Sequence, residues 1–216
     1  MDLTIDLSGA DLGGAPLSNA DLNGAILTGA SLKYTDLKGA RLNGANLGSA
    51  LLTGAILIGT SLEGADLSST DLRDAELFTA ALINATLSGA DLSKANLSGS
   101  DLRDANLNGA DFSRASLYQA DLSNANLAFA SLRSAILDGA RLIDANLANA
   151  HLNHAYLRGA DLSGVDLTGA DLRGADLSEA VLTQLQLDAA KSYRGAILPP
   201  GLGQPSSSLS YLFGRC

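Results

Sequence analysis

Leucine occupies every fifth position of this chain from Leu7 to Leu187, and Phe112 is the one substitution in that series. A small residue, nearly always alanine, stands two positions before each of them. A period of five matches neither the 3.6-residue turn of an α-helix nor the two-residue alternation of a β-strand. Only a backbone that turns a corner every five residues returns the same position to the inside each time. The chain is therefore predicted to be a solenoid.

The repeating unit reads A-[D/N]-L-x-x, as in residues 65–69 (ADLSS) and 105–109 (ANLNG). About 37 such units follow one another over residues 5–187. This pattern resembles the pentapeptide-repeat family. The resemblance implies an all-β fold, a right-handed quadrilateral β-helix with one unit per side and four per coil. About nine coils would follow, and at the ~4.8 Å spacing of adjacent strands the rod would be about 44 Å long.

In that fold the central leucine and the preceding alanine point inward, and the other three positions point outward. The resulting core is narrow and full, with no room for a buried ligand. Glycine is frequent at the last position of the unit, for example Gly24 and Gly29, where a corner favours a positive φ. Small residues replace the alanine at five positions, and the hydroxyls of the four that are threonine or serine are expected to bond to the local backbone. These residues are Thr35, Thr60, Thr70, Ser100 and Val165.

The ends of the repeat predict the domain organisation. We expect the β-helix to cover residues 1–187, a short C-terminal α-helical cap to cover residues 188–198, and a flexible Gly/Pro/Ser tail to cover residues 199–216. No cap is recognisable at the N-terminus, so the first coil would present an open sheet edge. Such an edge is compatible with a homodimer that forms through a terminal coil or the cap. It is also compatible with a chain that is a domain excised from a larger protein.

Charge and cysteine content restrict the class of protein. The net charge of −9 argues against direct nucleic-acid binding and against binding to an anionic membrane surface. No apolar run approaches the length that spans a membrane. The single cysteine, Cys216, forms no intramolecular disulfide, and no signal peptide is recognisable. We therefore expect a cytoplasmic protein.

No arrangement of residues predicts catalysis. Phosphate-binding loops and Ser/His/Asp or Cys/His constellations are not recognisable, so the chain is not expected to be an enzyme or to hold a cofactor. His151 and His154 lie three residues apart, but nearby metal ligands to complete a site are lacking. Both histidines are therefore expected to be ordinary surface residues.

Three aspartates would stack on one side if a coil has twenty residues, namely Asp71, Asp91 and Asp111. Stacked like charges are destabilising, so such a column would bind a cation or hold a raised pKa unless it is compensated. Compensation is the favoured interpretation, because basic residues follow closely on the same side. They are Arg73, Lys94 and Arg114.

One side of the rod is expected to carry an outward-facing apolar stripe. Such a stripe marks a candidate protein-interaction face, although β-branched and aromatic residues also suit exposed strands in general. Ile83 and Ile143 on another side favour the second interpretation. The candidate face consists of Ile56, Ile58, Phe78, Tyr118, Ile136 and Tyr156.

Two functions are compatible with these features. The first is a non-enzymatic, protein-binding scaffold rod whose protein partner is unknown. The alternative is a DNA mimic that binds DNA gyrase or another type II topoisomerase, as in the quinolone-resistance branch of the family. B-DNA of this length would carry about 26 charges, whereas residues 1–187 carry −11. The uninterrupted register also looks more like the regular bacterial members, which are numerous in cyanobacteria.

Overall fold

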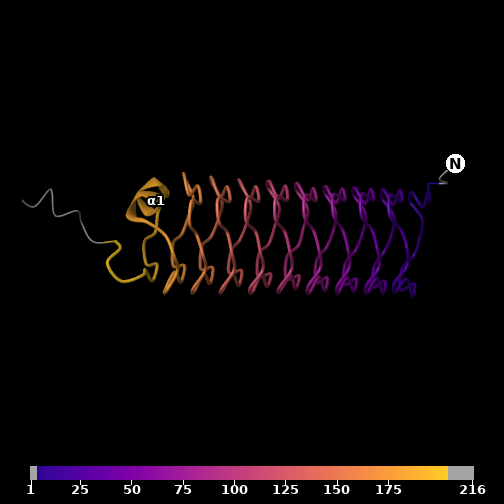
Figure 1. The fold of residues 1–216 in the computed structure, drawn as a ribbon, viewed down its shortest axis with the longest axis horizontal. Helices are drawn as coiled ribbons and strands as arrows, with labels where there is room; N and C mark the ends of the chain where they lie inside the picture. The colour runs from indigo at the N-terminus through magenta and orange to yellow at the C-terminus, as the bar shows by residue number, and fades with distance from the viewer. Residues whose placement is uncertain (1–3, 204–216) are drawn as a thin grey trace, which may run out of the picture.

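The computed structural model describes residues 4–203, which wind into a straight rod with helix α1 (Gln184–Ala189) near its C-terminal end (Figure 1). On each side of a coil, a parallel bridge joins one residue to the residue twenty positions later in the next coil, as in Asp6↔Ile26 and Asp91↔Asp111. Bridges begin at every fifth residue, so one coil contains four units and has four sides. The five-residue period and the twenty-residue coil are both confirmed.

Each unit contributes a single bridging residue and then a two-residue turn. The leucine amide donates to the next coil, as from Leu92 to the carbonyl of Asp111 at 2.7 Å. The following alanine amide closes the turn, as from Ala95 to the carbonyl of Leu92 at 3.0 Å. A corner follows every bridge. Residues 4–203 therefore contain only isolated parallel bridges, and none of these extends into a strand of several residues.

The core is a stack of leucine and alanine side chains along the rod axis. From Leu27 to Leu177 every central residue is essentially inaccessible to solvent, and Phe112 fits the same position with 0 % exposure. Leu7, Leu12 and Leu17 in the first coil are only partly buried, because they pack against the next coil on one side alone. The predicted inward and outward positions are therefore correct.

Hydroxyl groups at the alanine position are satisfied inside the rod. Thr60 Oγ1 donates to the carbonyl oxygen of Leu37 in the preceding coil at 2.9 Å, and Thr35 and Thr70 make equivalent bonds. Ser100 Oγ donates locally, to the carbonyl of Leu97 at 2.7 Å. The expected local bond thus holds for serine, whereas the threonines tie two coils together.

The C-terminal cap differs from the prediction. The capping helix was expected over residues 188–198, but α1 spans Gln184–Ala189 and has Thr183 as its N-cap. The Thr183 hydroxyl accepts from the amide of Gln186, and the Gln186 side chain accepts from the amide of Thr183, so this capping box fixes the start of the helix. Leu187 still enters the core with 0 % exposure.

Residues 191–198 return to the coil instead of continuing the helix. Ser192 pairs with Asp171 and Ile197 pairs with Asp176, so the spacing becomes 21 because α1 adds one residue. The amide of Gly203 donates to Gln184 Oε1 at 2.9 Å, which holds the first residues of the expected tail against α1. The rest of that tail, residues 204–216, lies outside the described residues. No helix in residues 4–203 has the length and apolarity needed to cross a membrane.

Candidate binding surfaces

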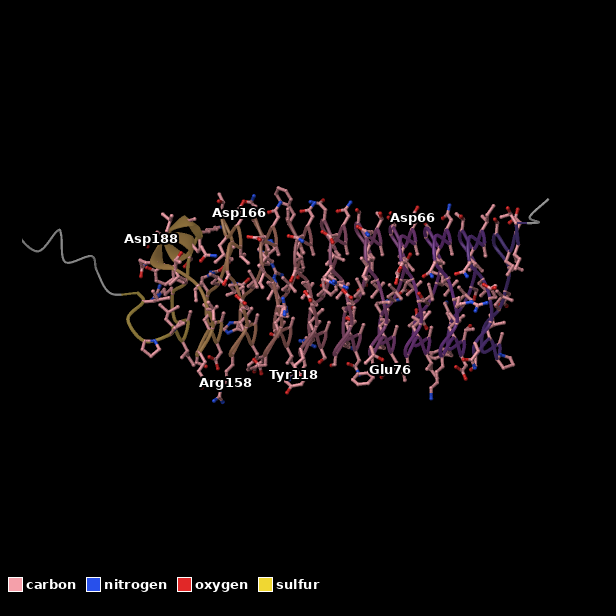
Figure 2. All side chains as sticks on the ribbon, viewed as in Figure 1. Asp66, Glu76, Tyr118, Arg158, Asp166 and Asp188 are labelled. Carbon is pink, nitrogen blue, oxygen red and sulfur yellow. The ribbon has the colours of Figure 1, made fainter. Side chains whose placement is uncertain are left out.

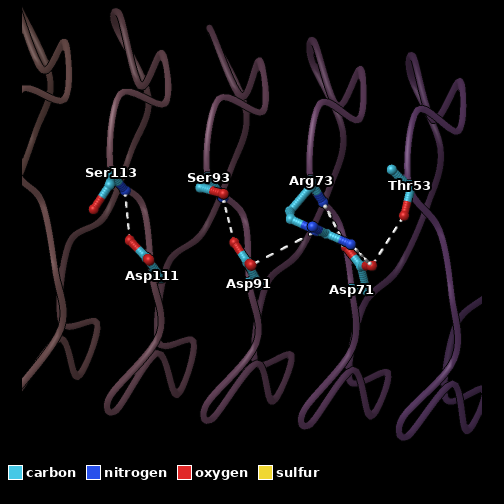
Figure 3. Close-up of polar contacts among 7 residues, drawn as sticks. All are labelled: Thr53, Asp71, Arg73, Asp91, Ser93, Asp111 and Ser113. Atoms are coloured by element: carbon cyan, nitrogen blue, oxygen red, sulfur yellow. Dashed lines mark hydrogen bonds and ion pairs between the residues drawn. The ribbon is translucent and has the colours of Figure 1, made fainter.

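The predicted aspartate column is present and is neutralised at one end (Figure 3). Arg73 donates to both carboxylate oxygens of Asp71, from Nε at 2.8 Å and from Nη2 at 2.7 Å. Arg73 Nε also lies 3.8 Å from Asp91 Oδ2. These hydrogen bonds from Arg73 lower the pKa of Asp71 to about 2, so the raised pKa considered for the column is wrong at Asp71.

The other two aspartates of the column cap the backbone. Asp91 Oδ1 accepts the amide of Ser93 at 2.9 Å, and Asp111 Oδ1 accepts the amide of Ser113 at 2.8 Å (Figure 3). Within residues 4–203, Lys94 and Arg114 form no ion pair with them, so the expected compensation comes from Arg73 alone.

The same bond explains the Asp/Asn position of the whole repeat. A side-chain oxygen at this position accepts the amide two residues later, as Asp66 does from Ser68 at 2.9 Å and Asn146 from Ala148 at 2.9 Å. This Asx-type bond satisfies an amide at the corner of the coil. The preference for Asp and Asn is therefore structural, and the sequence pattern alone did not reveal it.

Arginine two residues after aspartate forms a recurrent clamp. Arg173 binds Asp171 through Nε at 2.8 Å and Nη2 at 2.6 Å, and Arg103 binds Asp101 in the same way. Asp171 is only 4 % exposed, and the bonds from Arg173 hold its pKa well below the ordinary range. These buried or half-buried carboxylates are paired, and among residues 4–203 no group of acidic, His or Cys side chains is suited to hold a metal.

The predicted apolar face lies on one side of the rod, where Figure 2 shows Tyr118 with Glu76 and Arg158. Phe78, Tyr118 and Tyr156 are about half exposed. Ile56 and Ile136 are also exposed, whereas Ile58 is half-buried. All the predicted residues thus share one side, and their role as an interface stays a prediction.

Polar residues divide that side into two clusters. Asn96 Nδ2 donates to Glu76 Oε2 at 3.0 Å, and the hydroxyls of Ser98 and Ser116 lie 2.8 Å apart. We call Ile56, Ile58 and Phe78 the proximal apolar cluster, and Tyr118, Ile136 and Tyr156 the distal apolar cluster.

The distal apolar cluster occupies three successive coils of one side. Ile136 bridges Tyr156 directly. On this side, Ser98 and Ser116 are eighteen residues apart in the sequence and their hydroxyls are in contact. Tyr118 and Ile136 are also eighteen residues apart, at the equivalent positions of the next coils.

A groove that the sequence pattern did not reveal follows the corner after the side that contains Leu92 and Leu172. It consists of two hollows, about 460 and 690 Å³ in volume, which share Arg133, Asn153 and His154. Each of six successive coils contributes one cationic or imidazole side chain to it. We call this the basic groove, lined by Lys94, Arg114, Arg133, His154, Arg173 and Arg194. Its signal in the sequence was a basic residue or histidine recurring at intervals of nineteen to twenty-one residues.

Comparison with known proteins agrees with this geometry. The family model for pentapeptide repeats matches residues 5–44, 44–80, 80–117, 110–147 and 145–184. The chain belongs to the pentapeptide repeat family. This membership accounts for the β-helical scaffold of four-unit coils, in which short turns alternate with single bridging residues.

Several solved pentapeptide repeat proteins are similar to this chain. HetL, involved in heterocyst differentiation regulation in the cyanobacterium Nostoc sp. strain PCC 7120, is 37% identical, with 89% of this chain and 86% of HetL covered and a TM-score of 0.41. A trypsin-treated form of QnrB1, a plasmid-mediated fluoroquinolone resistance protein, is 21% identical over 97% of this chain and 94% of QnrB1, with a TM-score of 0.41. A protein from the Arabidopsis thaliana thylakoid lumen is 29% identical over 61% of this chain and 71% of its own, with a TM-score of 0.34. No curated protein matches the chain.

Proposed function

We propose that this chain is a non-enzymatic scaffold rod that binds a protein partner through the side carrying the two apolar clusters. We also propose that the rod is right-handed and has about nine coils, as the resemblance to the family implies. The observation that carries the binding proposal is the distal apolar cluster, where successive coils of one side present three exposed apolar side chains on a rigid backbone. Contiguous apolar surface on a rigid face is typical of protein-binding sites.

The charge distribution supports this function over DNA mimicry. Arginines interrupt the acidic surface along the rod, for example Arg41 bound to Asp21 at 2.6 Å and Arg158 bound to Glu179 at 2.7 Å. A phosphate backbone presents unpaired charge at regular intervals instead. We further propose a cytoplasmic location and, as a second partner, another copy of the chain bound at a terminal coil.

Paired variants test the proposal. Immobilised wild-type rod is used to capture proteins from a lysate of the source cells, alongside the distal variant Y118S/I136S/Y156S and the proximal variant I56S/I58S/F78S. We expect a captured protein, repurified, to bind wild type directly and to bind one of the variants at least about tenfold more weakly. All these residues are outward-facing, so both variants should keep the wild-type circular dichroism spectrum. A partner that binds all three proteins equally would show that this side is not the interface.

A further inference from the structure

Most cations of the basic groove form no ion pair within residues 4–203. Every described arginine outside the groove forms an ion pair with a carboxylate, namely Arg41, Arg73, Arg103, Arg141 and Arg158. Within the groove only Arg173 does so, with Asp171.

The other groove cations have no such partner. Lys94, Arg114, Arg133 and Arg194 are exposed and form no ion pair with any residue in the described range 4–203. Exposed cations that pair with no carboxylate among the described residues are available to an anion from outside.

The dimensions of the groove suit an extended ligand. One positive or imidazole side chain per coil, at about 4.8 Å per coil, gives about 24 Å from Lys94 to Arg194. An extended peptide of about seven residues spans this length. A small anion would contact only one or two of these side chains, whereas a chain of carboxylates contacts several, and an arginine fork binds each carboxylate with two hydrogen bonds.

The surface beside the groove adds an apolar contact. The corner leads directly to the bridge positions of the next side, where Ile136, Tyr156 and Ile197 are exposed. Ile136 and Tyr156 belong to the distal apolar cluster, so the groove and that cluster form one continuous surface.

Carboxylates near the groove favour an acidic peptide over a nucleic acid as its ligand. Asp91 and Asp111 lie in the coils of Lys94 and Arg114, and Asp176 lies beyond the corner near Arg173. A nucleic acid carries a charge on every nucleotide and would meet these carboxylates with phosphates. A peptide can place a neutral or apolar residue at each such point.

We propose that the basic groove binds an extended acidic segment of a protein partner. Carboxylates of the segment bind Arg114, Arg133 and Arg194, and its apolar side chains pack on Ile136 and Tyr156. This inference rests on the proposed protein-binding function and names the chemistry of the partner. On a molecule with a net charge of −9, the groove is also the place toward which an acidic segment is steered.

The test measures binding of a fluorescein-labelled ten-residue peptide of alternating glutamate and tyrosine to the full chain by fluorescence anisotropy. The charge-reversal variant R133E/R194E removes two groove cations. The control variant K33E/K38E makes the same change in net charge at exposed lysines outside the groove. We expect micromolar binding to wild type, about tenfold or greater weakening in R133E/R194E, little change in K33E/K38E, and weaker binding as salt rises.

Three results would overturn the inference. They are no binding of the acidic peptide at millimolar protein, equal weakening by both variants, and tighter binding of a ten-nucleotide oligothymidylate at the same groove. The outcome is separable from that of the proposed function. A captured partner that depends on Tyr118 and Tyr156 but is insensitive to R133E/R194E would leave the scaffold function intact and remove only the acidic segment.

Discussion

The imidazole ring of His154 lies over the Cα of Gly174 in the next coil, so that a Cβ at position 174 would come within 2.5 Å of Nδ1. The ring of Tyr34 covers Gly54 in the same way, with Cε1 2.5 Å from the position of an added Cβ. Both glycines occupy the corner position twenty residues after the ring. A long side chain at a corner therefore covers the corresponding corner of the next coil. Glycine at that covered position leaves room for the side chain because it has no Cβ.

Gly174→Ala is expected to displace the His154 ring. Gly174 has a φ of +66°, so alanine costs about 1 kcal/mol for the left-handed backbone and more for the clash with the ring. Gly159→Ala is the matched control, because its φ is +64° and no atom lies within 4 Å of the added Cβ. Urea unfolding of both variants should show the larger loss for Gly174→Ala.

The double variant His154→Ala/Gly174→Ala separates the two causes. Removal of the ring should reduce the cost of alanine at position 174 to that of Gly159→Ala. Equal losses for Gly159→Ala and Gly174→Ala as single changes would mean that the ring moves aside freely and does not depend on the glycine.

The five-residue period predicted the core, because a corner every five residues leaves one register in which Leu and Ala are buried. The resemblance to the pentapeptide-repeat family, and not the period, implied the four-sided coil and hence the side on which each outward residue lies. The same period did not predict ion pairing, since Arg73 and Arg114 stand at neighbouring corner positions and only Arg73 forms a clamp with an aspartate. That difference depends on whether arginine comes two or three residues after aspartate.

The position of the cap could also not be read from the repeat. Decay of the pattern indicated a helix, but its start depends on the bonds between Thr183 and Gln186, and its end on the extended backbone of Ala190 at ψ 148°. The return to the coil at Ser192 had no signal in the period, because α1 shifts the register by one residue.

Asp71→Asn is expected to destabilise the rod at neutral pH and to have little effect in acid. The folded-state pKa of about 2 lies below the ordinary value of 3.8, so the carboxylate stabilises the fold above pH ~4 and loses this contribution as the pH falls toward 2. Arg73 is half exposed, so we expect only about 1 kcal/mol at pH 7. Urea unfolding at pH 7 and at low pH measures the difference.

Asp66→Asn provides the control for that experiment. Asp66 accepts the Ser68 amide but belongs to none of the ion pairs formed within residues 4–203. Its substitution should change stability little at pH 7, because asparagine also accepts this bond at other units. A loss as large as that of Asp71→Asn would contradict the assignment to the Arg73 clamp.

Phe112→Ala is expected to destabilise the rod by about 3–5 kcal/mol, because it removes a fully buried ring and leaves a cavity. Phe112→Leu restores the residue found at every other central position and should cost less than about 1.5 kcal/mol. Chemical denaturation monitored by circular dichroism compares the two variants. A loss for leucine as large as that for alanine would show that the neighbouring coils are shaped specifically for the ring.

Thr183→Ala is expected to loosen the last coil without unfolding the rod. It removes the hydroxyl that accepts the Gln186 amide at 3.3 Å, a loss of about 1 kcal/mol for an N-cap. Gln186 Nε2 also donates to the carbonyl of Leu162 at 2.7 Å, so the cap is tied to the preceding coil. Hydrogen exchange should become faster at the amides of Leu172 and Leu177, which pair with the residues after α1.

Leu185→Ala serves as the control for the cap, because Leu185 lies in the same helix and is 80 % exposed. It should leave hydrogen exchange in the last coil unchanged. Faster exchange in both variants would show that the effect does not depend on the capping bonds.

The rod is expected to leave DNA gyrase unaffected. A DNA mimic must present rows of unpaired negative charge, but on this rod Asp21, Asp101 and Asp171 are bound by arginines. The basic groove also runs along one corner of six coils. The DNA-binding surface of gyrase is expected to be positively charged, so the groove would repel it. A supercoiling titration with and without a fluoroquinolone, up to tens of micromolar rod, should show neither inhibition nor drug protection. Inhibition at low micromolar rod would instead make the acidic sides the functional site. R133E/R194E, which replaces two cations of the basic groove with carboxylates, should then inhibit more strongly.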